Sequence, residues 1–305
     1  MPRPSRRLVP TLVCAALLLA AGCGGTPDPN VSSPDSAPDL LQALPAPSTA
    51  PTVAPTTAPP TTAAPSTTRR PTTSAAPRGR ANGAASGAGG SSNINWRPVG
   101  GDEFNGSALD KSAWKAYNSV GAFGNGLRRP EAISQSDGLL RVTGRGDVSG
   151  GMAHQSGQLY GRWEFRARTQ PGRGFGSAIL LWPDSENFPE DGELDIMEVP
   201  GENRDLAHFV VHWSAENKMH GTRVPGDFSQ WHTFALEWLP DRITWYVDGV
   251  KQYENTDKAV IPTKPMHMTI QLDQGPFQNW IKAPDETTPE EVSLEVDWVR
   301  IYAAP

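Results

Sequence analysis

The chain has 305 residues, and its N-terminal third differs from the rest in composition and charge. The formal net charge is −6, and residues 1–93 carry seven arginines and three aspartates, so residues 94–305 carry −10. An acidic region of this kind disfavours nucleic acid and anionic polysaccharide as partners and suits a neutral ligand.

Residues 1–22 are predicted to be a lipoprotein signal peptide. Three arginines precede an apolar run over residues 8–21, which is too short for a transmembrane helix. The run ends in Leu-Ala-Ala-Gly before Cys23, which resembles a bacterial lipobox and implies cleavage before Cys23 and lipid attachment to its thiol. We therefore expect an extracytoplasmic lipoprotein anchored in the membrane at the bacterial cell surface. The alternative is an ordinary secretory signal and a secreted protein.

Residues 23–93 are predicted to be a disordered linker rich in Pro, Thr, Ala and Ser. Leu40, Leu41 and Leu44 are among its few large aliphatic residues, so it cannot bury enough apolar surface to fold. The only cysteine besides Cys23 is Cys14, inside the predicted signal peptide. The mature chain would therefore have no disulfide and no thiolate metal site.

Residues 94–305 are predicted to form one all-β domain. Short runs rich in β-branched and aromatic residues alternate with Gly, Pro, Asn and Asp, and no long stretch has helical periodicity. Residues 243–253, with Asp248-Gly249 at the centre, predict a hairpin with a type I′ turn. Many such strands favour a sandwich or a barrel. Trp163, Trp238, Trp245 and Trp298 are assigned to its interior.

The segment from Glu193 to Glu198 is the most informative part of the chain. Its three carboxylates alternate with apolar residues, but the alternation slips by one at the end. In a regular strand Glu193 and Asp195 share a face and Glu198 points the other way. A β-bulge in which Ile196 and Met197 oppose one partner residue would return Glu198 to the face of the other acids.

Three acids on one strand face fit glycoside hydrolysis. A retaining glycosidase needs a nucleophilic carboxylate and a proton-donating carboxylic acid, with carboxyl groups about 5–5.5 Å apart. A third carboxylate between them shifts both pKa values and helps to hold the pair in opposite protonation states. The alternative is a solvated acidic strand face, which is common where only two acids alternate.

The sequence Glu-Leu-Asp-Ile-Met-Glu resembles the signature of glycoside hydrolase family 16, in the bulged form of its laminarinase-like β-1,3-glucanases. The resemblance covers the chain from about residue 95 to the end, so it implies a catalytic domain over residues 94–305. It implies a jelly-roll β-sandwich of the concanavalin A-like type, whose concave sheet forms the active-site cleft. It also implies that Glu193 is the nucleophile, Glu198 the acid and base, Asp195 an electrostatic helper and Met197 the bulge residue. The other matching stretches are residues 102–114, 160–168, 231–238, 243–249 and 296–302.

Sugar binding needs aromatic platforms and polar groups that bond to hydroxyls. Phe188 stands where laminarinase-like relatives have a tryptophan. Leu180 stands at a second such position, and Trp182 would face the same side of a regular strand. His212 resembles a family position that reaches towards the carboxylates, and Gln271 aligns with an asparagine that contacts substrate. Asn118 and Trp280 are further substrate-binding candidates. His220 is predicted to lie in a loop at the edge of the cleft.

The resemblance implies that no cofactor is required. It implies at most a structural calcium, held by Asp297 and by carbonyls near Glu103 and Gly138, since calcium prefers oxygen ligands. The predicted function is retaining endo-hydrolysis of β-1,3-glucan or mixed β-1,3/1,4-glucan by a monomer that binds no nucleic acid. The alternatives are a cell-envelope transglycosylase, a hydrolase of another β-glycan, and a non-catalytic carbohydrate-binding module.

Overall fold

The computed structural model describes residues 94–305, so the predicted signal peptide, Cys23 and the linker lie outside the described residues. No helix in the described region is long and apolar enough to cross a bilayer. Two single-turn 3-10 helices, η1 (Ala122–Gly124) and η2 (Pro130–Ala132), accompany the strands. The strands are β1 (Arg97–Asp102), β2 (Trp114–Ala116), β3 (Ser119–Val120), β4 (Leu127–Arg128), β5 (Ile133–Ser136), β6 (Leu139–Gly144), β7 (Val148–His154), β8 (Gly161–Thr169), β9 (Phe175–Pro183), β10 (Glu193–Val199), β11 (Leu206–Trp213), β12 (Lys218–Pro225), β13 (His232–Leu239), β14 (Arg242–Val247), β15 (Val250–Asn255), β16 (Met266–Gln274) and β17 (Val292–Ala303).

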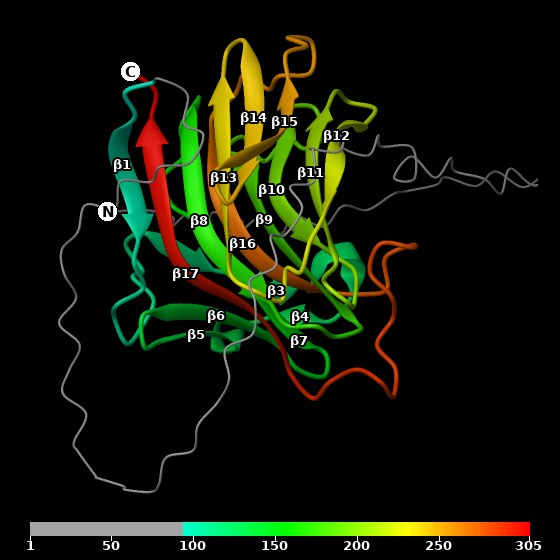
Figure 1. Cartoon of the computed structure of the whole chain (residues 1–305). Helices are drawn as coiled ribbons and strands as arrows, with labels where there is room; N and C mark the ends of the chain where they lie inside the picture. The colour runs from blue at the N-terminus through cyan, green and yellow to red at the C-terminus, as the bar shows by residue number, and fades with distance from the viewer. Residues whose placement is uncertain (1–93) are drawn as a thin grey trace, which may run out of the picture. The chain divides into compact units, whose positions relative to one another are not determined.

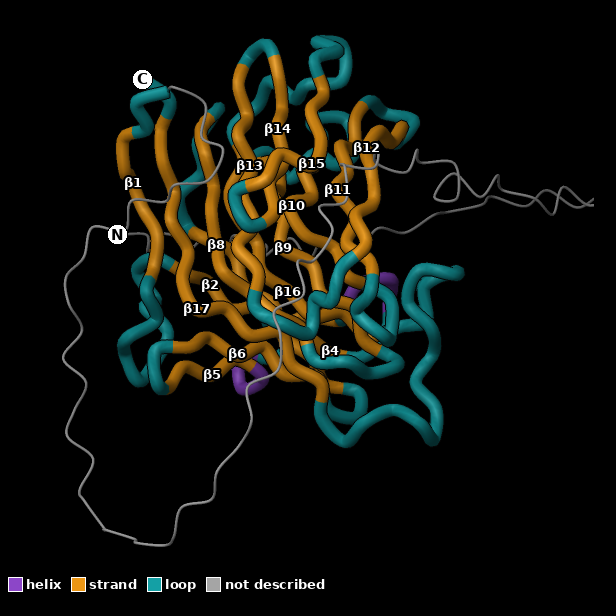
Figure 2. The backbone as a smooth tube through the Cα atoms, in the orientation of Figure 1, coloured by secondary structure: helices purple, strands orange, loops and turns teal. Residues whose placement is uncertain are grey.

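The strands form two sheets that face each other (Figure 1). The first sheet has the order β15-β14-β13-β8-β17-β6-β5, and β1 pairs with β17. The second has the order β12-β11-β10-β9-β16-β7-β4-β3, and β2 pairs with β7. Strands make up most of the backbone of both layers, and loops join their ends (Figure 2). The all-β sandwich predicted from the sequence is confirmed.

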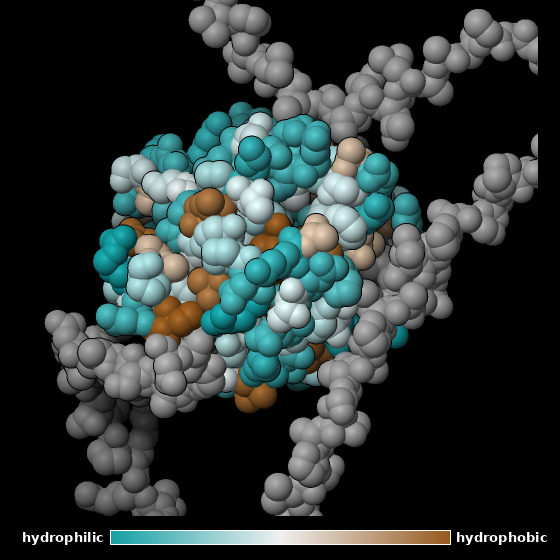
Figure 3. Space-filling view, turned by 90° about the horizontal axis from the view of Figure 1, so that it is seen from above, coloured by the Kyte–Doolittle hydropathy of each residue, from teal (hydrophilic) through white to brown (hydrophobic). Residues whose placement is uncertain are grey.

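The core lies between the sheets because side chains alternate across each strand. In β16, Met268, Ile270 and Leu272 are fully buried in the core, whereas Thr269, Gln271 and Asp273 lie on the opposite face. Trp163, Trp238 and Trp245 fill the interior as predicted. The surface seen from above is largely hydrophilic, with apolar residues in separate patches (Figure 3).

Trp298 does not lie in the interior, so that prediction was wrong. The register between β17 and β8 shifts between Val296 and Trp298, while Val296 and Val299 stay in the core. The shift turns Trp298 outwards, where the Arg300 guanidinium lies 4.1 Å from its ring centroid. The hairpin prediction is confirmed, because β14 and β15 are joined through Asp248 and Gly249 with φ values of 50° and 75°, as a type I′ turn requires.

Candidate active site

The predicted bulge is present in β10. Glu193 lies opposite His212 of β11, Asp195 opposite Val210 and Glu198 opposite His208, so two residues of β10 face one residue of β11. On the other side of β10, Met197 pairs with Ile179 of β9, and Ile196 has no partner in that strand. The extra residue in that ladder is therefore Ile196 and not Met197. The bulge brings all three carboxylates to the outer face of the second sheet, which we call the cleft face.

The cleft face is ordered in rows that run across the strands. One row contains His208, Glu198, Ala178, Gln271 and Gly151, from β11, β10, β9, β16 and β7. Gln271 therefore lies two strands from Glu198, with the small Ala178 between them. Although the acids point away from the core, Asp195 is only 1% exposed and Glu193 9%. Surrounding side chains and loops thus form walls around the carboxylates.

The wall at the Glu193 end is aromatic. Phe188, from the loop between β9 and β10, stacks on Trp182 with ring centroids 4.8 Å apart. The same ring lies 5.7 Å from His212, and the Trp182 indole donates a hydrogen bond of 2.9 Å to Glu186. Three predicted substrate-binding residues, Phe188, Trp182 and His212, are therefore brought together beside Glu193.

The wall at the Glu198 end comes from the loop between β16 and β17, residues 275–291, which we call the rim loop. It extends beyond the strands in orange and red-orange (Figure 1). Its Trp280 meets His208 edge-on, with ring centroids 4.3 Å apart. Ile281 packs over Gly176 of β9, where a Cβ atom would lie 2.7 Å from the isoleucine. The glycine therefore lets this loop lie close to the sheet, and Trp280 reaches the row of Glu198.

The three carboxylates share one electrostatic environment. Burial raises the pKa of Glu193 well above its usual value, and the charge of Asp195 and a hydrogen bond with it add to the effect. Burial is also the largest cause of the raised pKa of Glu198, and the charges of Asp195 and Glu193 raise it further. Because the groups are coupled, protons bind to them as a set. The arrangement favours a state in which one glutamic acid is protonated and the other is ionised.

His212 places a positive charge beside this set. Its Nε2 lies 3.4 Å from Asp195 Oδ2, and its Nδ1 lies 2.8 Å from Asn217 Oδ1. Burial acts to lower the pKa of His212, but the contacts with Asp195 and Asn217 outweigh it and raise the pKa to about 9. A protonated His212 therefore faces Asp195 at neutral pH.

An ion pair and a tyrosine near Gln271 were missed from the sequence. Arg128 Nε donates a 3.0 Å hydrogen bond to Asp273 Oδ1, and both side chains are largely buried. The Tyr117 ring lies over Gly151, where a Cβ atom would be 2.6 Å from the ring, and burial raises its pKa to about 12. Alternation along β16 could have indicated Asp273. The two-residue strand β4, which carries Arg128, has no pattern that predicts it.

Two further predictions fall outside the cluster of carboxylates. Asn118 is exposed and accepts a hydrogen bond of 3.1 Å from Arg129. His220 lies on the edge strand β12 and not in a loop, so its predicted position was wrong. It pairs with Val211, one residue before His212.

The residues of the predicted calcium site lie on the first sheet. Asp297 is in β17, Gly138 is in the turn between β5 and β6, and Glu103 follows β1, which pairs with β17. The Asp297 carboxylate accepts a 2.8 Å hydrogen bond from Arg166, and Glu103 pairs with Arg300 at 3.2 Å. Asp297, the one predicted carboxylate ligand, is therefore held by an arginine, whose charge opposes a cation. With Arg166 in this position the Asp297 side chain does not fit a calcium ligand, and no step below uses a metal.

Comparison with known proteins agrees with this geometry. The model of the family described as Glycosyl hydrolases family 16 matches residues 125–300, more than half of the chain. Beta-glucanase of Rhodothermus marinus is 32% identical over 247 residues, which cover 68% of this chain and 85% of that protein. Glucan endo-1,3-beta-glucosidase A1 of Niallia circulans is 25% identical and covers 69% of this chain, which spans 38% of that protein.

A solved structure shows the same fold over the described region. The laminarinase from Rhodothermus marinus aligns with a TM-score of 0.63 and 26% identity, covering 70% of this chain and all of that one. The matched family, the relative of 32% identity and the shared fold point the same way. The chain belongs to glycosyl hydrolase family 16.

Proposed function

We propose that this glycoside hydrolase cleaves internal bonds of β-1,3-glucan or mixed β-1,3/1,4-glucan with retention of configuration. The observation that carries the proposal is the bulge of β10, which aligns Glu193, Asp195 and Glu198 on the cleft face, with Glu193 and Asp195 buried and Glu198 partly exposed. The similarity to a beta-glucanase and a laminarinase supports a glucan as substrate.

In the first step the Glu193 carboxylate attacks the anomeric carbon and forms a glycosyl-enzyme ester. The bond to the leaving sugar oxygen breaks, and Glu198 donates its proton to that oxygen. In the second step Glu198, now a carboxylate, takes a proton from water. The water oxygen attacks the same anomeric carbon and releases Glu193, so configuration is retained after two inversions.

The coupling between the acids suits this change of roles. The negative charges of Asp195 and Glu193 both raise the pKa of Glu198, which keeps its proton in place for the first step. Once Glu193 is esterified its charge is lost, and the pKa of Glu198 falls. The same group is then better able to act as a base.

The aromatic wall gives the cleft its sugar-binding surface. The stacked Trp182 and Phe188 present a ring face beside Glu193, and the apolar face of a glucose ring can pack on it. Gln271, in the row of Glu198, offers amide groups to hydroxyls on the far side. These residues would hold the glucan across the strands with one bond between the two glutamates.

The test uses the full chain with linear β-1,3-glucan, mixed-linkage glucan, xyloglucan and agarose, and follows oligosaccharide products by chromatography. We expect cleavage of β-1,3- or mixed-linkage glucan by the wild type and none by Glu193→Ala. Cleavage of xyloglucan or agarose alone would contradict the proposed substrate. Longer products formed only with an added sugar acceptor would identify a transglycosylase instead.

We further propose that the protein is a lipoprotein attached to the bacterial membrane through Cys23. The apolar run and the Leu-Ala-Ala-Gly sequence before Cys23 support this location. The long Pro- and Thr-rich segment would then separate the catalytic domain from the membrane.

A further inference from the structure

A small pocket, separate from the cleft, adjoins its Glu198 end. It has a volume of about 160 Å³ and lies between the residues that follow β10 and the rim loop. Its lining includes Gly201, Glu202, Asn203, Asn279, Trp280 and Lys282. None of these residues takes part in the two chemical steps described above.

The pocket lies to the side of the path that a glucan would follow. The row of Glu198, Ala178 and Gln271 runs across the strands, and the polysaccharide would lie along it. Pro200, two residues after Glu198, also lines the pocket, so the pocket is displaced along the strand direction. Trp280 contacts His208 in the row of Glu198 and also lines the pocket, so it lies between the two sites.

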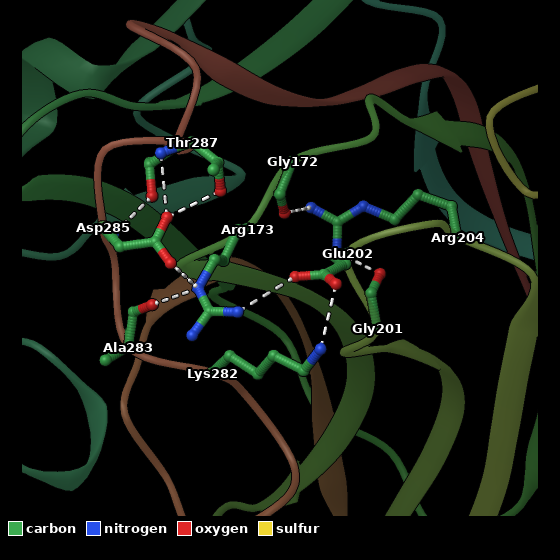
Figure 4. Close-up of polar contacts among 10 residues, drawn as sticks. Gly172, Arg173, Gly201, Glu202, Arg204, Lys282, Ala283, Asp285 and Thr287 are labelled. Carbon is green, nitrogen blue, oxygen red and sulfur yellow. Dashed lines mark hydrogen bonds and ion pairs between the residues drawn. The ribbon is translucent and has the colours of Figure 1, made fainter.

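A set of ion pairs fixes the two sides of this pocket. Figure 4 shows Arg173 between Asp285 and Glu202, while Lys282 reaches Glu202. Lys282 Nζ lies 2.9 Å from Glu202 Oε1, and this hydrogen bond is the main reason why the pKa of Glu202 is lowered. The rim loop is therefore tied to the segment that follows β10.

The exit of β10 is held as well. The buried Arg204 donates hydrogen bonds to the carbonyl oxygens of Val199 and Gly201, at 3.1 and 2.9 Å. Figure 4 shows its guanidinium group between Gly172 and Gly201. The backbone that forms the pocket edge is thus fixed independently of any ligand.

The lining has the chemistry of a site for one sugar ring. Trp280 supplies an aromatic surface, and Asn203 and Asn279 supply amide donors and acceptors. The paired Glu202 and Lys282 form the charged edge of the pocket. Both amides are exposed, so a ligand could reach them. We propose that this pocket binds a single hexose unit that branches from the glucan backbone bound in the cleft.

A branch fits the geometry better than a backbone sugar, because the pocket lies along the strands and the backbone crosses them. The free primary hydroxyl at C6 of a β-1,3-linked glucose is the exocyclic position from which such a branch extends. The inference rests on the proposed function and adds a preference for glucan with single β-1,6-glucosyl branches.

Gly201 allows a sharp test. Its φ is not in the left-handed region, and the nearest atom to an added Cβ is Asp205 Oδ1 at 3.8 Å. Gly201→Leu would fill the pocket without backbone strain, and Gly201→Ala, which adds one methyl group, is the matched control. We would measure kcat/KM of the full chain on linear β-1,3-glucan and on the same backbone with single β-1,6-glucosyl branches.

We expect Gly201→Leu to lower kcat/KM on the branched glucan by about tenfold, as loss of one or two hydrogen bonds and a stacking contact would. Its activity on the linear glucan and its melting temperature should match those of Gly201→Ala. Equal effects on both glucans, or no effect on either, would overturn the inference. If Gly201→Leu does not fold, Asn203→Ala and Asn279→Ala replace exposed side chains and must show the same selective loss. No cleavage of either glucan by the wild type would refute the proposed function itself.

Discussion

The indole N–H of Trp245 donates a 2.8 Å hydrogen bond to the backbone carbonyl of Asp195. Trp245 belongs to β14 of the first sheet, so this bond crosses the core and reaches the residue that directly precedes the bulge. The packing of one sheet thus supports the irregular backbone of the other. Trp245 therefore supports the alignment of Glu193 and Glu198 through the backbone of Asp195, although it is hydrogen-bonded to neither glutamate.

Replacing Trp245 should therefore lower activity by more than the accompanying loss of folding stability would cause. Trp245→Phe removes the hydrogen bond and leaves space in the core, which should lower the free energy of unfolding by about 1–3 kcal/mol. It should also lower kcat, because the bulge is less firmly held. Trp238→Phe is the matched control, since its indole bonds to the carbonyl of Pro262 at 3.2 Å, away from the bulge. Chemical denaturation and steady-state kinetics would compare them, and an equal kcat for both variants would contradict this role.

Asp195 should set the pH range of the reaction. Its negative charge raises the pKa of both Glu193 and Glu198. In Asp195→Asn both pKa values fall, so both limbs of the profile of kcat/KM against pH should move to lower pH. We also expect kcat to fall on the order of 10²-fold, the size of a general acid–base contribution. An unchanged profile with lower kcat would assign Asp195 a purely steric role.

The raised pKa values also make a prediction about stability. Carboxyl groups with a raised pKa in the folded state stabilise the fold fully below their unfolded pKa of about 4.5. That stability is lost as pH rises through the folded pKa. Glu193→Gln should therefore raise the free energy of unfolding at pH 7–8, by about 1.4 kcal/mol for each unit by which the folded pKa lies above the unfolded one. The melting temperature should rise with it, and the gain should vanish near pH 4. Glu286→Gln, at an exposed position, is the control. A loss of stability at pH 7 would show that the ionised Glu193 stabilises the fold.

Parts of the site could be predicted from the sequence because they depend on local pattern. The slip of alternation in residues 193–198 was enough to predict the bulge, and Asp248-Gly249 was enough to predict the turn. Trp298 was misplaced because it stands beside another apolar residue, Val299, where the alternation in β17 changes phase, and the pattern alone does not say which of the two enters the core. The Arg128–Asp273 pair joins residues 145 positions apart. Such a contact depends on how β4 and β16 meet through β7, which no local pattern specifies.

The proposed membrane location of the protein depends on one cysteine. Cys23→Ser should release the protein from the membrane fraction, because an unmodified serine cannot carry the lipid anchor. Fractionation and immunoblotting would measure the distribution. Cys14→Ser is the control and should leave the protein in the membrane fraction. Continued membrane retention of Cys23→Ser would contradict the lipoprotein hypothesis.

The most direct test of the mechanism is to trap the intermediate. A 2-deoxy-2-fluoro β-glucoside, extended with β-1,3-linked glucose and carrying a good leaving group, should form a glycosyl-enzyme that hydrolyses slowly. Mass spectrometry of the labelled protein and its peptides would locate the ester. We predict one label on Glu193, absent in Glu193→Gln. A label on another residue, or turnover of glucan with inversion and no label, would contradict the assigned nucleophile and the retaining mechanism.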